Sequence, residues 1–94
     1  MKIRYYMDPQ TGLPHIHGHA VDEDEVREAM LRSVEDRLGK DGSRVTIGGT
    51  SGGRYLKVVY VPDLESDSVF VITAYELRGK PLSAFRHRSR RKLL

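Results

Sequence analysis

Apolar and polar residues alternate at the start of the chain, over residues 2–7. Ile3, Tyr5 and Met7 fall on one side of this pattern, and charged or phenolic residues fall on the other. A period of two is typical of a strand that buries one face. We therefore expect an N-terminal strand that ends before the turn-forming segment 8–12, Asp-Pro-Gln-Thr-Gly.

A helical period replaces the alternation after Asp22. Val26, Met30 and Val34 are four residues apart, which places them on one stripe of a helix. Asp22 is a candidate N-cap, and the acidic residues after it complement the positive N-terminal end of the helix dipole. Residues 14–19 are a candidate for one or two further helical turns, so the first half of the chain predicts one or two helices.

Three further strands are predicted in the second half of the chain. They comprise residues 45–47, 54–61 and 68–75, and the glycine-rich segment 48–53 connects the first two as a hairpin. A Gly-Lys-Pro segment introduces a last helix, over residues 80–94, because proline suits the first turn of a helix. This order predicts an α+β domain with an antiparallel sheet of three to four strands and a basic C-terminal helix.

The alternation also predicts which side chains share a face of the sheet. If the helices cover the face that contains Ile3, Leu56 and Val58, the opposite face is rich in Arg, Lys and Tyr. Such a face can hold phosphates and stack on bases, and a solvated face of an antiparallel sheet is the alternative. The residues assigned to this opposite face are Arg4, Tyr6, Arg44, Thr46, Tyr55, Lys57 and Tyr75.

The composition fits one domain that covers residues 1–94. Hydrophobic residues make up 38% of the chain and charged residues 31%, as in ordinary globular proteins. Cysteine is absent, which excludes disulfides and cysteine-ligated zinc and suits a reducing cytoplasm. Because no apolar run has the length of a signal peptide or a membrane helix, we expect a cytoplasmic protein without a membrane partner.

The net charge of +3 is distributed unevenly. Residues 1–77 contain nine Lys or Arg and thirteen Asp or Glu, whereas residues 78–94 contain seven Lys or Arg and no acid. Concentrated positive charge attracts polyanions, and a solubilising tail is the alternative. Leu82, Phe85, Ser89 and Leu93 form a non-basic, mainly apolar stripe on the last helix, so its arginines should point outward. The candidate RNA-binding residues are Arg78, Lys80, Arg86, His87, Arg88, Arg90 and Arg91.

Two short motifs raise the question of a ligand site. His15, His17 and His19 would share a face of a regular strand and offer imidazoles to zinc or nickel. A proline and a glycine in the same segment disfavour such a strand, so a turn stabilised by histidine is the favoured interpretation. Residues 48–53 lack the lysine and the helix start of a phosphate-binding P-loop. Neither a metal site nor a cofactor is predicted.

Several segments share their order and local motifs with a known family. Residues 6–9, Tyr-Met-Asp-Pro, provide an aromatic-x-Asp-Pro segment, and residues 15–26 provide a histidine-centred turn into an acidic helix. Residues 71–75, Val-Ile-Thr-Ala-Tyr, match a final strand. A characteristic meander spacing is followed by Arg44, Gly49, Thr50, Gly53, Arg54, Leu56, Val58 and Val59. Over about residues 6–76 the chain thus resembles the BrnT-type toxins, which belong with the RelE-like toxin fold.

Some positions depart from the pattern of that family. Tyr75 stands where the family commonly has an arginine, and Gly42 stands where it has a glutamate. His19 occupies the place of the family's histidine, whereas Gly18 replaces a usual lysine. If the family's arginine and glutamate are catalytic, activity here is weaker or is arranged differently.

The resemblance implies the toxin of a type II toxin–antitoxin pair, a metal-independent endoribonuclease. The ribose 2′-hydroxyl would attack the adjacent phosphorus, which requires a base, an acid and cations around the phosphorane. Arg44 and Arg54 are the candidates for phosphorane stabilisation. Lys57 adds charge or, when desolvated, acts as the base, and Tyr75 donates a proton or stacks on a base. His87 is an alternative acid.

The resemblance also implies a cognate antitoxin, often a small dimeric DNA-binding protein that covers the active face. The sequence leaves open whether the chain forms a homo-oligomer. The alternative function is a non-catalytic RNA-binding or protein-interaction module on the same fold. Cleavage of RNA in EDTA, as against salt-sensitive binding without cleavage, separates the two functions.

Overall fold

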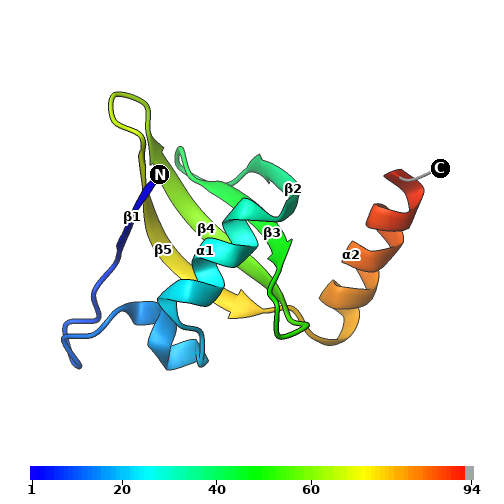
Figure 1. Cartoon of the computed structure of the whole chain (residues 1–94), viewed down its shortest axis with the longest axis horizontal. Coiled ribbons are helices and arrows are strands. Elements are labelled where there is room, and N and C mark those ends of the chain that lie inside the picture. The colour runs from blue at the N-terminus through cyan, green and yellow to red at the C-terminus, as the bar shows by residue number, and fades with distance from the viewer. Residues whose placement is uncertain (93–94) are drawn as a thin grey trace.

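A five-stranded mixed sheet forms the framework of the protein (Figure 1). The computed structural model describes residues 1–92, and residues 93–94 lie outside the described part. In chain order the elements are β1 (Lys2–Tyr5), the 3-10 helix η1 (His15–His19), α1 (Glu23–Leu31), β2 (Ser33–Leu38), β3 (Arg44–Gly49), β4 (Tyr55–Asp63), β5 (Ser68–Glu76) and α2 (Gly79–Lys92).

The sheet has the strand order β1-β5-β4-β3-β2, with β4 in the middle. β1 runs parallel to β5, and the other neighbours are antiparallel. The predicted α+β class, N-terminal strand and C-terminal helix are confirmed. The strands β3, β4 and β5 form the predicted antiparallel meander. β2 extends it at one edge, and the sequence pattern did not predict this strand. β1 adds a parallel strand at the other edge.

α1 begins with a capping box and ends before the end of the predicted apolar stripe. Asp22 accepts a hydrogen bond from the Glu25 backbone, and the Glu25 side chain accepts one from the Asp22 backbone. The helix ends at Leu31, so the placement of Val34 on the helical stripe is wrong. Val34 lies in β2 instead, because the residues after Arg32 form backbone pairs with β3.

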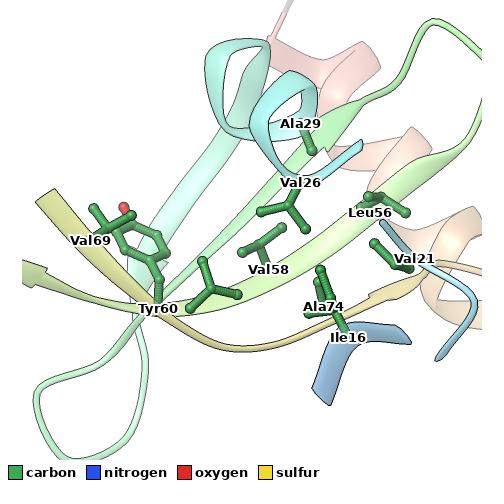
Figure 2. Close-up of a cluster of buried hydrophobic side chains, with 10 residues drawn as sticks. Ile16, Val21, Val26, Ala29, Leu56, Val58, Tyr60, Val69 and Ala74 are labelled. Carbon is green, nitrogen blue, oxygen red and sulfur yellow. The ribbon is translucent and has the colours of Figure 1, made fainter. Parts of the chain in front are cut away.

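The main core lies between α1, η1 and one face of the sheet (Figure 2). α1 packs directly against the backbone of β3, because Gly48 has no side chain and a Cβ there would overlap the carbonyl of Ala29. Ile16 anchors η1 in the same core and is 1% exposed. The buried residues of this cluster are Ile16, Val21, Val26, Ala29, Leu56, Val58, Tyr60, Val69, Val71 and Ala74.

α2 packs on the opposite face of the sheet. Its Phe85 is 1% exposed and packs with Ile47 of β3. Ile47 pairs with Lys57, whereas the core residue Val58 pairs with Thr46, so the two clusters lie on opposite faces. The helices therefore cover both faces, not the single face assumed from the alternation. Figure 1 shows α2 apart from α1, where the chain leaves β5.

The C-terminal helix is confirmed over residues 79–92. Leu82 packs against the Phe85 cluster as the apolar stripe predicts, and Leu93 lies outside the described residues. Among the helices of residues 1–92, none combines the length and the apolar character needed to cross a bilayer.

Candidate functional site

Arg44 lies on the α1 face of the sheet, where a carboxylate binds it. Its Nε donates to Asp36 at 2.8 Å, and the Tyr60 hydroxyl donates to the other oxygen of the same carboxylate at 2.5 Å. The hydrogen bond to Asp36, followed by the charge of Asp36, raises the pKa of the Arg44 guanidinium. The assignment of Arg44 and Thr46 to the opposite face is wrong, because Thr46 pairs with Val58 and is 1% exposed.

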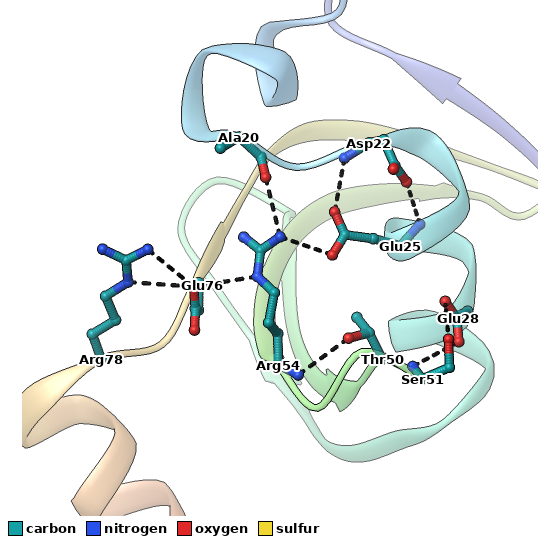
Figure 3. Close-up of polar contacts among 9 residues, drawn as sticks. All are labelled: Ala20, Asp22, Glu25, Glu28, Thr50, Ser51, Arg54, Glu76 and Arg78. Atoms are coloured by element: carbon teal, nitrogen blue, oxygen red, sulfur yellow. Dashed lines mark hydrogen bonds and ion pairs between the residues drawn. The ribbon is translucent and has the colours of Figure 1, made fainter.

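Arg54 connects three segments of the fold through its guanidinium. Figure 3 shows its guanidinium between Ala20, Glu25 and Glu76. Nη1 donates to the Ala20 carbonyl at 3.1 Å and to Glu25 at 2.8 Å, while Nε donates to Glu76 at 3.2 Å. The Arg54 side chain is 25% exposed. Its charge is therefore already balanced by carboxylates of the protein.

Arg78 shares the Glu76 carboxylate but remains open to solvent. Its Nη2 and Nε lie 3.1 Å and 3.3 Å from Glu76 Oε1, and its side chain is 80% exposed. The hydrogen bond from Arg78 lowers the pKa of Glu76, and the charges of Arg78 and Arg54 lower it further. This exposed ion pair is weak in water, so Arg78 can turn to another anion at little cost.

Lys57 and Tyr75 face each other across β4 and β5, on the face that α2 covers in part. Lys57 Nζ lies 5.8 Å from the centre of the Tyr75 ring. The His19 ring from η1 lies 6.0 Å from the Tyr75 ring, measured between ring centres. His19, Tyr75, Glu76 and Arg78 line a shallow pocket of about 220 Å³. Two of the four predicted catalytic residues, Lys57 and Tyr75, are therefore brought together. Arg44 lies on the other face of the sheet, and Arg54 is bound to Glu76 at the edge of this pocket.

The local conformation of η1 determines where its histidines point. Ala20 ends the 3-10 helix in the left-handed conformation, with φ 57°. His17 turns to Glu23 of α1 and donates a hydrogen bond to its carboxylate, which is the main reason that the pKa of Glu23 is lowered. His15 and His19 instead lie next to each other, with ring centres 5.3 Å apart. The strand with three histidines on one face, which metal binding would need, is thus not formed.

The sequence pattern did not predict that His15 and His19 lie next to aromatic side chains. His15 lies 5.8 Å from the Tyr6 ring, measured between ring centres. Within residues 1–92, no three His, Cys, Asp or Glu side chains are grouped so that they could hold a metal ion. Three histidines within five residues were a signal in the sequence, but their neighbours come from distant parts of the chain.

The basic residues of α2 do not form one uniform surface. Arg88 donates to both oxygens of Glu35 in β2, at 2.8 Å and 3.0 Å, and this pair attaches the helix to the sheet. Arg86 and Arg90 border a groove of about 530 Å³ whose apolar wall includes Tyr55. The predicted RNA-binding residues that are exposed are Arg78, Lys80, Arg86, His87, Arg90 and Arg91.

The glycine-rich loop between β3 and β4 is a hairpin, as predicted. Thr50 donates its backbone N–H to the Arg54 carbonyl at 2.8 Å, which closes the loop. Ser51 donates both its backbone N–H and its hydroxyl to Glu28 of α1. A carboxylate of the protein therefore occupies the donors that a phosphate would need.

Comparisons with protein-family models, with curated proteins and with solved structures find no match to this chain. The assignment of a function consequently depends on the geometry of the pocket and on the motifs of the sequence.

Proposed function

We propose that this protein is an endoribonuclease that cleaves RNA without a metal at the pocket of His19 and Tyr75. One observation carries the proposal. His19, Tyr75 and Arg78 line one pocket, and Lys57 Nζ lies 5.8 Å from the centre of the Tyr75 ring, so an imidazole and two cations surround one phenol. Neither the His19 side chain nor the Lys57 side chain has a hydrogen-bond or ion-pair partner among residues 1–92.

These groups match the needs of cleavage by the ribose 2′-hydroxyl. His19 accepts the proton of the hydroxyl as its oxygen bonds to phosphorus, because an unprotonated imidazole nitrogen has a lone pair that can take the proton. Lys57 and Arg78 stabilise the phosphorane. The bond from phosphorus to the 5′ oxygen then breaks, and the Tyr75 hydroxyl donates a proton to that oxygen. The products are a 2′,3′-cyclic phosphate and a 5′-hydroxyl end.

The resemblance to BrnT-type toxins extends the proposal to a biological role. The nuclease would be the toxin of a type II toxin–antitoxin pair in the cytoplasm. Its antitoxin, a small DNA-binding dimer, would cover the pocket until cleavage is needed. The exposed basic residues of α2 offer the RNA further phosphate contacts.

Incubation of the purified protein with single-stranded RNA in EDTA tests the proposal. We expect discrete cleavage, and we expect His19→Asn and Tyr75→Phe to lower kcat by about 100-fold or more, as loss of a general acid or base does. His17→Asn is the matched control, because His17 lies outside the pocket and asparagine can still donate to Glu23. Equal kcat values for His19→Asn, Tyr75→Phe and His17→Asn would contradict the assignment of His19 and Tyr75 to the reaction.

A non-catalytic RNA-binding module is the second candidate function. It is favoured by the pairing of Arg44 and Arg54 with carboxylates, since neither arginine is free to stabilise a phosphorane. The same experiment separates the two functions. Binding that weakens with salt, without any product of cleavage, would support the module.

A further inference from the structure

We propose that the substrate is an extended single strand whose bases stack along a row of four rings, Tyr6, His15, His19 and Tyr75. We call these residues the ring row. The inference deepens the proposed function, since it rests on that function for the position of the cleaved phosphate, at the Tyr75 end. It adds a binding surface that reaches well beyond the pocket.

The ring row is continuous although its members come from three separate segments. Tyr6 follows β1, His15 and His19 lie in η1, and Tyr75 lies in β5. Neighbouring ring centres are 5.8 Å, 5.3 Å and 6.0 Å apart along the row. The steps are nearly equal, so the row offers regularly spaced contacts to a chain of bases.

Neighbouring rings of the row do not stack face to face on one another. The angles between neighbouring ring planes are 57°, 79° and 57°, so no two neighbouring rings are parallel. Tyr6 is 44% exposed and the His15 side chain 38% exposed. Faces of these rings are consequently open to the flat surface of a ligand. A run of exposed rings is more typical of a binding site than of an ordinary solvated surface.

The charges around the row indicate how a nucleic acid would lie on it. Lys57 and Arg78 flank the Tyr75 end and suit phosphates, and Arg78 also balances the charge of Glu76, which lines the same pocket. At the other end, Asp8 lies 4.0 Å from His15 and disfavours a phosphate there. Contacts near Tyr6 would therefore be made through bases, whose faces stack on aromatic side chains whatever their identity. Bases of a duplex are already stacked on their neighbours, so the row favours a single strand.

Binding of DNA oligonucleotides isolates this step from cleavage, because DNA lacks the 2′-hydroxyl. We expect the full chain to bind a single strand of mixed sequence at least 10-fold more tightly than the matching duplex, as followed by fluorescence anisotropy. Tyr6→Ala should weaken single-strand binding about 5-fold to 150-fold, the range that corresponds to loss of one stacked base. Tyr6→Phe should retain the affinity, because the ring remains.

Leu64→Ala is the matched control, since Leu64 is 95% exposed in the turn between β4 and β5. The inference is overturned if the duplex binds as tightly as the single strand, or if Tyr6→Ala binds like the unchanged protein. Failure of the proposed function is seen separately. RNA would then remain uncleaved while Tyr6→Ala still weakened the binding of single strands.

Discussion

At the scale of single residues, the surroundings of an arginine determine what it can do. Arg54 and Arg78 both bind Glu76, yet the side chain of Arg54 is 25% exposed and that of Arg78 is 80% exposed. Arg54 also holds the N-terminal end of α1 through Glu25. The same residue type thus stabilises the fold at one position and is available to a ligand at the other.

Arg54→Ala should lower the melting temperature, on the order of 5 °C. The substitution removes the ion-pair partner of Glu25, leaves Glu76 with the exposed Arg78 alone, and frees the Ala20 carbonyl. Thermal unfolding followed by circular dichroism measures the effect. Arg37→Ala is the control, because Arg37 is 55% exposed and 3.8 Å from its carboxylate. A variant that melts like the original protein but no longer cleaves RNA would instead place Arg54 in the chemistry.

At the scale of elements, β2 is the strand that the pattern of apolar and polar residues does not predict. It lies at the edge of the sheet, and most of its side chains are exposed on both faces. Such a strand has no alternation of buried and exposed positions, since there is no covered face to impose one. Its backbone pairs with β3 and the bond between Glu35 and Arg88 hold it in place.

The contact between α1 and β3 leads to a prediction for Gly48. Gly48→Ala should lower the free energy of unfolding by about 1–3 kcal/mol, because the added methyl group forces the helix away from the strand. Chemical denaturation measures the change. At the neighbouring Gly49, a Cβ would lie at an ordinary 3.5 Å from the Tyr55 ring, so Gly49→Ala is the matched control. Equal losses of unfolding free energy in Gly48→Ala and Gly49→Ala would show that the flexibility of glycine, and not the close contact between α1 and β3, determines the effect.

At the scale of the whole molecule, different helices cover the two faces of the sheet. α1 and η1 complete the core on one face, and α2 places basic residues on the other. The pocket lies where η1, the end of β5 and the residues before α2 meet. A strand of RNA that follows the ring row would arrive next to the basic helix.

The basic surface of α2 should control how salt affects RNA binding. Replacement of Arg86, Arg90 and Arg91 by glutamine should reduce the slope of log affinity against log salt by about 2, if each arginine contacts one phosphate. Arg88→Gln should change the slope less, because Glu35 already holds Arg88. Titrations at several salt concentrations measure both slopes. An unchanged slope in the triple variant would assign α2 to another partner.

Local features of the sequence determined most of the elements and part of the site. The period of Ile3 and Tyr5, the cap at Asp22 and the glycines of the 48–53 hairpin act over a few residues, so they can be recognised in the chain alone. The concentration of charge after residue 77 is likewise a property of the sequence. Lys57 and Tyr75 were found because both lie in strongly patterned strands.

Only the tertiary structure decided which residues meet. Alternation shows which residues of one strand share a face, but the pairing between strands places Arg44 and Lys57 on opposite faces. The ring row joins positions 6, 15, 19 and 75, which lie next to each other only because η1 packs beside β5. Contacts between distant segments depend on how the whole chain packs, and no short stretch of sequence contains that information.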